Sequence, residues 1–201
     1  KAGIKPFTTW AELLDGVQKL KGIGVIPIAL GGGDKWPGHF WWVYLAVRIG
    51  GQEAFLKAYN RTGSFTDEPF VRAGEELLKL VELEPFQDGF LGAAYGDQAG
   101  LMGNGKAAME LMGQWAPYSQ QQNAEDTAGI GEDLGYFSFP MVEGGAGKGT
   151  DVMGGGNGYI VGKNAPDEAV EFLKFITSVE NNSSLAAAGK IIPVVKGAEL
   201  A

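Results

Sequence analysis

The sequence predicts an α/β fold that is rich in helices. Segments with an apolar face at helical spacing alternate with short apolar runs of strand length, and this alternation is typical of helices that cover a sheet. The clearest helix signal is the pair Thr9 and Glu12, which have the spacing of a capping box. The clearest strand signal is the apolar run at residues 25–30, which is bounded by glycines.

The composition indicates a globular protein and argues against several functions. With 201 residues, of which 45% are hydrophobic and 20% charged, the chain can form one large domain or two small ones. The formal net charge of -8 argues against a nucleic-acid partner, which would need a basic surface. The absence of cysteine excludes disulfides and cysteine metal ligands. Since no run of about 18 apolar residues occurs, no segment is expected to span a membrane.

The other elements are predicted from the same two signals, apolar residues at helical spacing and short apolar runs of strand length. Glycine clusters at residues 31–33, 144–149 and 154–158 are expected to be loops, the first of them a flexible turn. Strands are expected at residues 25–30, 107–112, 136–140 and 158–162. Helices are expected at residues 9–22, 40–49, 52–59, 68–81, 95–102, 167–176 and 180–188, with a further helix beginning near Pro117.

The stretch from Gly103 to Tyr118 contains the first candidate for a binding residue. A short, nearly uncharged run at residues 107–112 is followed by Gly113, and Pro117 suits the first turn of a helix. Trp115 would therefore lie at a strand-to-helix junction. In open α/β sheets, ligands bind beyond the carboxyl ends of the strands. The alternative interpretation is that Trp115 is a core residue.

A second candidate has the same layout of strand, glycines, and then polar and aromatic side chains. It is the loop at residues 34–39, which contains Asp34, Trp36 and His39. Trp36 is interpreted either as a ligand contact or as a partly buried residue. For His39, the only histidine, a hydrogen-bonded structural role is favoured over a ligand contact.

An enzyme is one alternative class. A glycosidase pair could be drawn from the 24 acidic residues, but spacing alone locates none. A catalytic triad through His39 lacks a Gly-x-Ser-x-Gly motif. Residues 144–150 resemble a phosphate-binding loop only superficially, because Gly149 follows Lys148 where Ser or Thr is needed. A metal site would need carboxylates alone, and no EF-hand pattern is present. No catalytic residue, metal or cofactor is therefore predicted.

A protein-interaction module is the other alternative class. Trp41, Trp42 and Tyr44 could line a groove for a partner protein. Because their surroundings are continuously apolar, packing in the core is favoured over a partner groove.

Four stretches of the sequence follow one another in a recognisable order. They are AGIKPFTTWAELL, VIPIALGG, GNGKAAMELMGQWA and MGGGNGYIVGKNAPDEAVEFLKFITSVE. Together they cover nearly the whole chain and resemble bacterial extracellular solute-binding proteins of sugar-importing ABC transporters. The resemblance implies a periplasmic-binding-protein-like (type II) lobe, helix-rich and with short strands in a mixed sheet. It also implies a non-catalytic protein that holds a sugar or oligosaccharide in a cleft between two lobes.

The resemblance further implies how the chain is divided. Residues 1–150 would be most of the second, C-terminal lobe, and residues 151–201 would be the return crossing and part of the first lobe. The opening part of the N-terminal lobe is expected to be missing, which would make the chain a fragment. Apolar surface and strand edges around residues 151–160 would then be uncovered, so self-association is expected.

Individual residues correspond to the family by position. Trp115, in GQWA, matches the family's tryptophan that stacks on a sugar ring, and Gly154 and Gly155 match a glycine pair at which the backbone approaches the ligand. Residues 34–39 lie where the family places polar and aromatic contacts. The implied partners are a carbohydrate and an ABC permease. The implied location is extracytoplasmic, either in the periplasm or lipid-anchored at the outer face of the cell membrane.

Overall fold

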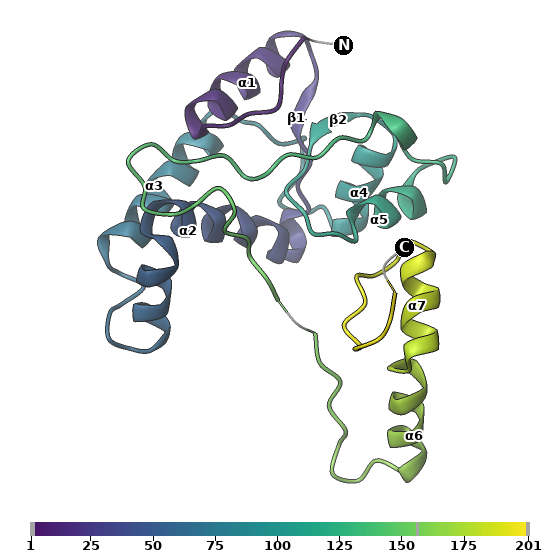
Figure 1. The fold of residues 1–201 in the computed structure, drawn as a ribbon. Helices are drawn as coiled ribbons and strands as arrows, with labels where there is room; N and C mark the ends of the chain where they lie inside the picture. Colours follow the sequence, from purple (N-terminus) through teal and green to yellow (C-terminus); the bar gives the residue numbers. More distant parts are fainter. Residues whose placement is uncertain (1–2, 156, 200–201) are drawn as a thin grey trace. The chain divides into compact units, whose positions relative to one another are not determined.

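The computed structural model describes residues 3–155 and 157–199 (Figure 1). This part of the chain divides into two compact units. The first unit contains the residues up to Met112 and residues 119–153, and the second contains residues 113–118 and those from Gly154 onward.

The first unit consists of helices around a short parallel sheet. Its helices are α1 (Trp10–Gly22), α2 (Trp36–Tyr59), α3 (Glu68–Glu82) and α4 (Tyr95–Gly103). Its strands, β1 (Ile26–Ile28) and β2 (Ala107–Met109), pair in parallel, with Ile28 opposite Met109. Two 3-10 turns are η1 (Gly32–Asp34) and η2 (Gly131–Asp133), and α5 (Ala116–Asn123) begins in the second unit and ends in the first. The predicted helix-rich α/β fold is confirmed.

Helix α1 begins where the sequence predicts and is tied to α3. The N–H of Glu12 donates to the Thr9 hydroxyl at 3.2 Å, and the N–H of Thr9 donates to the Glu12 carboxylate at 3.1 Å, which completes the capping box. Trp10 is buried, and its indole N–H donates to Oε2 of Glu76 in α3 at 3.0 Å. Glu76 also accepts from Lys79 at 2.8 Å. The polar edge of a core tryptophan is thereby satisfied.

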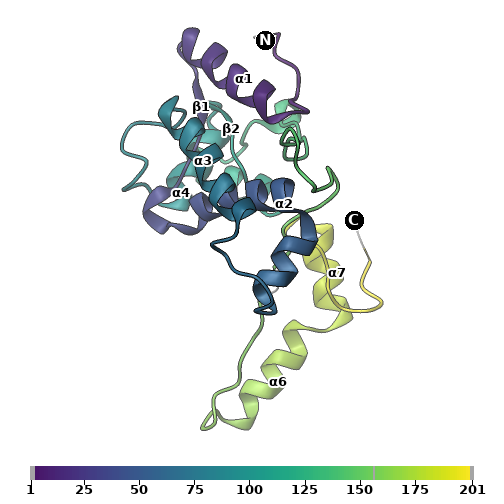
Figure 2. The same cartoon turned by 90° about the vertical axis from the view of Figure 1, so that its left-hand side faces the viewer.

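The aromatic run in the first half of α2 packs in the core, as predicted. Trp41 is buried, and the rings of Trp42 and Tyr44 are half-buried against the same core. Trp42 stacks on Phe70 of α3 with ring centroids 5.8 Å apart, and Tyr44 stacks on Phe139 at 5.1 Å. In agreement with these contacts, α2 and α3 lie side by side in both views of the ribbon (Figures 1 and 2).

Helix α2 consists of two helical segments that meet at a kink, which agrees with the two helices predicted at residues 40–49 and 52–59. The kink is at Gly51, whose φ of 66° and ψ of 178° fall in a region that glycine reaches without a steric penalty. The interruption lies at the glycines, as predicted. The second helical segment begins directly after Gly51.

Residues 144–149 dock against this kink. The carbonyls of Arg48 and Ile49 accept from the N–H groups of Gly147 at 3.0 Å and Ala146 at 2.9 Å. A Cβ atom at Gly147 would collide with the backbone of α2, so only glycine permits this approach. The segment is therefore a close-packed structural loop.

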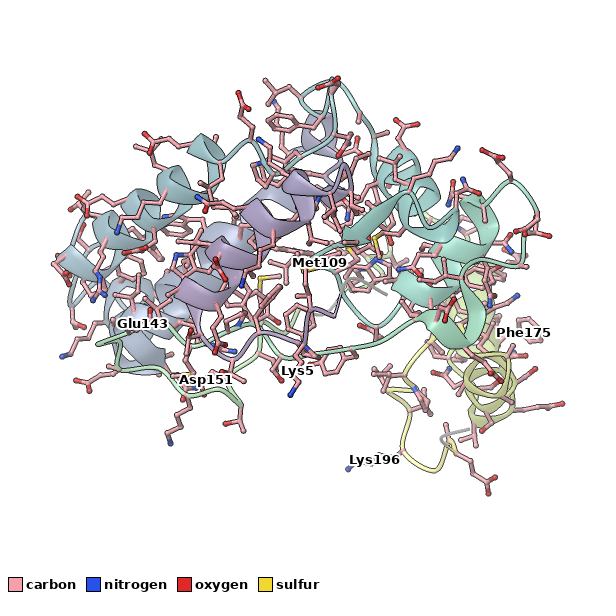
Figure 3. The ribbon with its side chains drawn as sticks, turned by 90° about the horizontal axis from the view of Figure 1, so that it is seen from above. Lys5, Met109, Glu143, Asp151, Phe175 and Lys196 are labelled. Atoms are coloured by element: carbon pink, nitrogen blue, oxygen red, sulfur yellow. The ribbon has the colours of Figure 1, made fainter. Side chains whose placement is uncertain are left out.

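Arg48 is a fully buried cation that anchors residues 139–151, here called the return segment, on which Glu143 and Asp151 are labelled in Figure 3. Its Nε and Nη2 donate to the carbonyl of Phe139 at 3.2 and 3.0 Å. Its Nη1 donates to the carbonyl of Asp151 at 2.7 Å, and Nη2 donates to that of Gly149 at 3.3 Å. Burial lowers the pKa of Arg48, and the Asp151 carboxylate acts in the opposite direction. The guanidinium is thus solvated by backbone carbonyls instead of water.

Two predicted strands are wrong. Residues 136–140 form no strand, and the adjacent Met141 makes only an isolated bridge with Thr9. Residues 158–162 form no strand either, and Ile160 is 95% exposed. A short apolar run becomes a strand only where a neighbouring strand supplies hydrogen bonds and a packed face, and neither run has such a neighbour within the described residues.

The second unit contains the helices α6 (Asp167–Ile176) and α7 (Val179–Ala187), which follow one another directly (Figure 2). Ser178 caps α7, because its Oγ accepts from the N–H of Asn181 at 3.2 Å. Asn182 is buried and donates to the carbonyls of Ile176 and Ser178, both at 3.2 Å. These bonds fix the turn between the two predicted helices.

We expect Arg48→Met to lower the free energy of unfolding by about 3–5 kcal/mol, because three backbone carbonyls lose a buried donor. Arg72→Met is the matched control. It removes a guanidinium that makes one exposed bond, to the carbonyl of Glu143 at 2.7 Å, and should cost less than about 1 kcal/mol. Urea unfolding of both variants measures the difference. Equally small losses would contradict the anchoring role of Arg48.

Candidate ligand-binding site

The carboxyl ends of β1 and β2 lie at the same edge of the sheet, because the strands are parallel and in register. The N–H of Ala29 donates to the carbonyl of Met109 at 2.9 Å, and Met109, labelled in Figure 3, is the last residue of β2. The segments that leave the strands therefore begin side by side, at Ala29 and Glu110. This is the edge at which open α/β sheets bind ligands.

Residues 31–33 form a close-packed turn, and the prediction of a flexible turn is wrong. The N–H groups of Gly32 and Gly33 donate to carbonyls within residues 90–94, both at 2.9 Å. A Cβ atom added to Gly31 would lie 2.8 Å from the backbone of that segment. Only glycine lets the two backbones approach so closely, and the chain that leaves β1 is therefore held against the start of α4.

Asp34 extends this contact to α4. Its Oδ2 accepts from the N–H of Tyr95, the first residue of α4, at 2.7 Å. A carboxylate at the N-terminus of a helix is stabilised by the unpaired N–H groups there. The next residue, Lys35, has a φ of 66°, a conformation that costs a residue with a side chain about 1–3 kcal/mol. A strained residue thus directly precedes Trp36.

Trp36, Phe40 and Tyr95 form an aromatic cluster beside the turn. The ring centroids of Trp36 and Tyr95 are 5.0 Å apart, and those of Trp36 and Phe40 are 5.3 Å apart. Trp36 is 36% exposed, and its neighbour His39 is also exposed, with its ring 6.3 Å from that of Phe40. The cluster therefore covers Trp36 only in part.

The structure places Trp36 and His39 in the first turn of α2, whereas the sequence predicted a loop that lasts to residue 39. Pro37 explains the earlier start, because its fixed φ suits the first turn of a helix and its missing N–H is not needed there. Helical spacing also places Trp36 and Phe40, four residues apart, on the same face.

Three more residues at this edge were not predicted from the sequence, namely Gln98, Glu110 and Gln120. Gln98 and Gln120 are buried, and each donates from its Nε2 to one oxygen of the half-buried Glu110 carboxylate at 2.7 Å. Burial raises the pKa of Glu110, and the bonds from Gln120 and Gln98 act in the opposite direction. Oε1 of Gln98 accepts from the N–H of Gly31 at 2.8 Å, so the network reaches the glycine turn.

The other predicted site residues belong to the second unit. Trp115 is half-buried, and a Cβ atom at Gly113 would collide with its ring. Gly154 and Gly155 are exposed, and a Cβ atom on either would meet nothing within 4 Å. Asp34, Trp36 and His39 lie in the first unit and the other three in the second, and the assignment of all six residues to the site stays a prediction.

Three further observations concern the described part of the chain. It contains no cluster of three or more metal-binding side chains, and none of its helices is both long and apolar enough to cross a membrane. A surface hollow of about 790 Å³ lies beside the start of β1, lined by Lys21, Glu84 and Phe86 among others. It contains none of the predicted site residues.

The geometry is that of a helix-rich α/β lobe whose two parallel strands end at the same edge, and sequence comparison gives its family. Residues 1–183 match the bacterial extracellular solute-binding protein family, and the chain belongs to this family. It is 33% identical over 118 residues to an uncharacterized ABC transporter extracellular-binding protein of Pyrococcus horikoshii, and 29% identical over 153 residues to a probable sugar-binding periplasmic protein of Mesorhizobium japonicum. The resemblance found in the sequence is confirmed.

A solved structure shares the fold. The chain superposes on a chitin oligosaccharide binding protein with a TM-score of 0.84 at 30% identity, covering 100% of this chain and 51% of that one. The match to the Pyrococcus protein covers 58% of this chain and 26% of that protein. The match to the Mesorhizobium protein covers 75% of this chain and 34% of that protein. The chain therefore spans about half the length of the solved relative and a smaller share of the curated ones.

We expect Gly31→Ala to lower the free energy of unfolding by about 1–3 kcal/mol, because its Cβ atom would press on the backbone near Ala94. Gly38→Ala is the control. Gly38 lies in the first turns of α2 with no atom within 4 Å of the added Cβ, so alanine should be neutral or stabilising. Thermal unfolding of the two variants measures the contrast, and the same melting temperature for both would exclude the close packing.

The raised pKa of Glu110 predicts how stability depends on pH. Between the ordinary value near 4.5 and the higher folded value, the folded protein binds more protons than the unfolded chain. Stability therefore falls as pH rises through this window. Glu110→Gln should abolish that part of the fall, whereas Glu125→Gln, which changes an exposed carboxylate paired with Lys106, should retain it. Unfolding free energies measured at intervals from pH 4 upward provide the test. A Glu110→Gln profile parallel to that of the wild type would contradict the assignment.

Proposed function

We propose that this chain is part of the substrate-binding component of a carbohydrate ABC importer. In this proposal, a sugar or oligosaccharide is held by aromatic stacking and hydrogen bonds, and the protein catalyses no reaction on it. The family is a solute-binding one. The names of the relatives support the carbohydrate as ligand and the ABC transporter as partner.

The observation that carries the proposal is the partly exposed Trp36, fixed at the carboxyl edge of the parallel sheet beside Asp34 and His39. A pyranose ring has an apolar C–H face that fits an indole, and hydroxyl groups that need donors and acceptors around it. Covering about 80 Å² of indole at about 25 cal/mol per Å² contributes about 2 kcal/mol. Stacking on one tryptophan with several added hydrogen bonds is thus sufficient for weak binding.

The proposal extends to the second unit through Trp115, Gly154 and Gly155. Trp115 follows β2 by six residues and precedes α5, and it is the second proposed stacking residue. Residues 1–150 are proposed to be the C-terminal lobe, and residues 151–201 the return crossing and part of the N-terminal lobe. The boundary between the two units at residues 153 and 154 supports this arrangement, whereas residues 113–118 group with the second unit.

The proposed location is outside the cytoplasm, in the periplasm or lipid-anchored at the outer face of the membrane. The name of the Mesorhizobium relative supports a periplasmic location, and that of the Pyrococcus relative supports an extracellular one. The permease of the importer is the proposed protein partner.

Calorimetric titration of the full-length gene product with monosaccharides and chitin oligosaccharides tests the proposal. We expect saturable binding without hydrolysis. Trp36→Ala and Trp115→Ala should each weaken it by about 2–3 kcal/mol, which is roughly 30- to 200-fold. Tyr59→Ala is the control, because Tyr59 is an exposed aromatic residue at the far end of α2.

Melting temperatures of the ligand-free variants separate binding from folding. Lost affinity with an unchanged melting temperature is the expected result. If either tryptophan is instead a core residue, its removal leaves a cavity and costs about 3–5 kcal/mol of stability with affinity retained. Hydrolysis of a titrated oligosaccharide would favour the enzyme alternative and refute the transport role.

A further inference from the structure

We propose that Glu110 is a positioning residue for the sugar site, acting through Gln98 on the turn that carries Asp34 and Trp36. This inference rests on the proposed function and adds to it a residue that the tryptophan assignments do not include. Its basis is a continuous chain of hydrogen bonds between the ends of the two strands.

Each side-chain group in this chain of hydrogen bonds has a partner. The N–H of Gly31 donates to Oε1 of Gln98 at 2.8 Å, and Nε2 of Gln98 donates to Oε2 of Glu110 at 2.7 Å. Oε1 of Glu110 accepts from Nε2 of Gln120, also at 2.7 Å. Glu110 directly follows β2 and Gly31 lies three residues beyond β1, so the network joins the two segments that leave the sheet.

The polarity of the network requires a carboxylate. Gln98 cannot reverse its amide without turning a donor toward the N–H of Gly31, so its Nε2 must face Glu110. With Gln120 on the other oxygen, Glu110 receives a donor on each side. An ionised carboxyl group accepts at both oxygens, and charge-assisted bonds of this kind are short.

Close helix packing fixes the two glutamines. Gln98 lies in α4 and Gln120 in the part of α5 that belongs to the first unit. A Cβ atom at Gly100 of α4 would lie 3.0 Å from the carbonyl of Asn123, and one at Gly103 would collide with that of Gln120. The two helices therefore meet backbone to backbone, which fixes the positions from which both glutamine side chains reach Glu110.

The network also gives a reason for the Glu110 carboxylate, whose burial lowers the stability of the fold. Glu110 is half-buried, and none of the salt bridges among the described residues involves it. A partly buried carboxylate without a cation destabilises the fold, and such conflicts are characteristic of functional sites. The turn that it holds leads through Asp34 directly to the exposed Trp36.

Glu110→Leu tests the inference, because leucine has a similar size and accepts no hydrogen bond. We expect sugar affinity of the full-length gene product to fall at least tenfold, at a temperature where the variant is folded. The amide resonance of Gly31 should shift in the ligand-free protein. Glu125→Leu, which removes an exposed carboxylate in a salt bridge with Lys106, should change neither.

Exchanging the carboxylate and the amide between positions 98 and 110 should restore sugar affinity. Gln98→Glu alone opposes two carboxylates and should weaken binding at least tenfold. The double variant Gln98→Glu/Glu110→Gln restores an acceptor for Gly31 and a donor for every acceptor, so it should bind within about threefold of the wild type. This pair of variants also carries the test if Glu110→Leu does not fold.

The outcomes separate the two proposals. If the wild type binds no carbohydrate, the proposed function is wrong. If the wild type binds but Glu110→Leu stays within twofold of it, or the double variant fails to recover from Gln98→Glu, the positioning role of Glu110 is wrong and the proposed function is untouched.

Discussion

The candidate site depends on one steric constraint, the direct contact between the backbone of residues 31–33 and that of residues 90–94. A single Cβ atom on the first segment would separate the two. This contact brings Asp34 within reach of the N-terminus of α4 and Gly31 within reach of Gln98. The aromatic cluster, the helix cap and the buried network are consequences of two backbones lying closer than any other residue type allows.

The sequence predicted local features well and pairings poorly. The capping box at Thr9 acts within a few residues, so its signal is complete in the sequence. Pro37 acts just as locally, but α2 begins four residues earlier than predicted. Glu110 was overlooked because it stands in a nearly uncharged run, and its partners Gln98 and Gln120 become neighbours only when α4 packs on α5. Residues 136–140 had the pattern of a strand, but a strand requires a partner that no local pattern specifies.

Arg48 and Glu110 show two ways of holding a charge inside the first unit without a salt bridge to any described residue. The cation of Arg48 is surrounded by carbonyls of the return segment, and the anion of Glu110 by side-chain amides. Each charge therefore orders several neutral groups that are far apart in the sequence. Neutral partners for a buried charge can come from any part of the chain, because every segment contains backbone carbonyls. An oppositely charged partner requires a particular side chain at a particular position.

The anchoring of Arg48 also affects the order in which the protein can be completed during its synthesis. The carbonyls that surround its guanidinium belong to residues 91, 101 and 103 positions later in the chain. At a typical elongation rate, a ribosome needs about 5–20 s to add that length. During this interval the nascent α2 carries a cation and an aromatic face whose cover has not yet been made. Arg48 can therefore reach its buried state only after residues 139–151 are available, so the packing of α2 is expected to be completed late in folding.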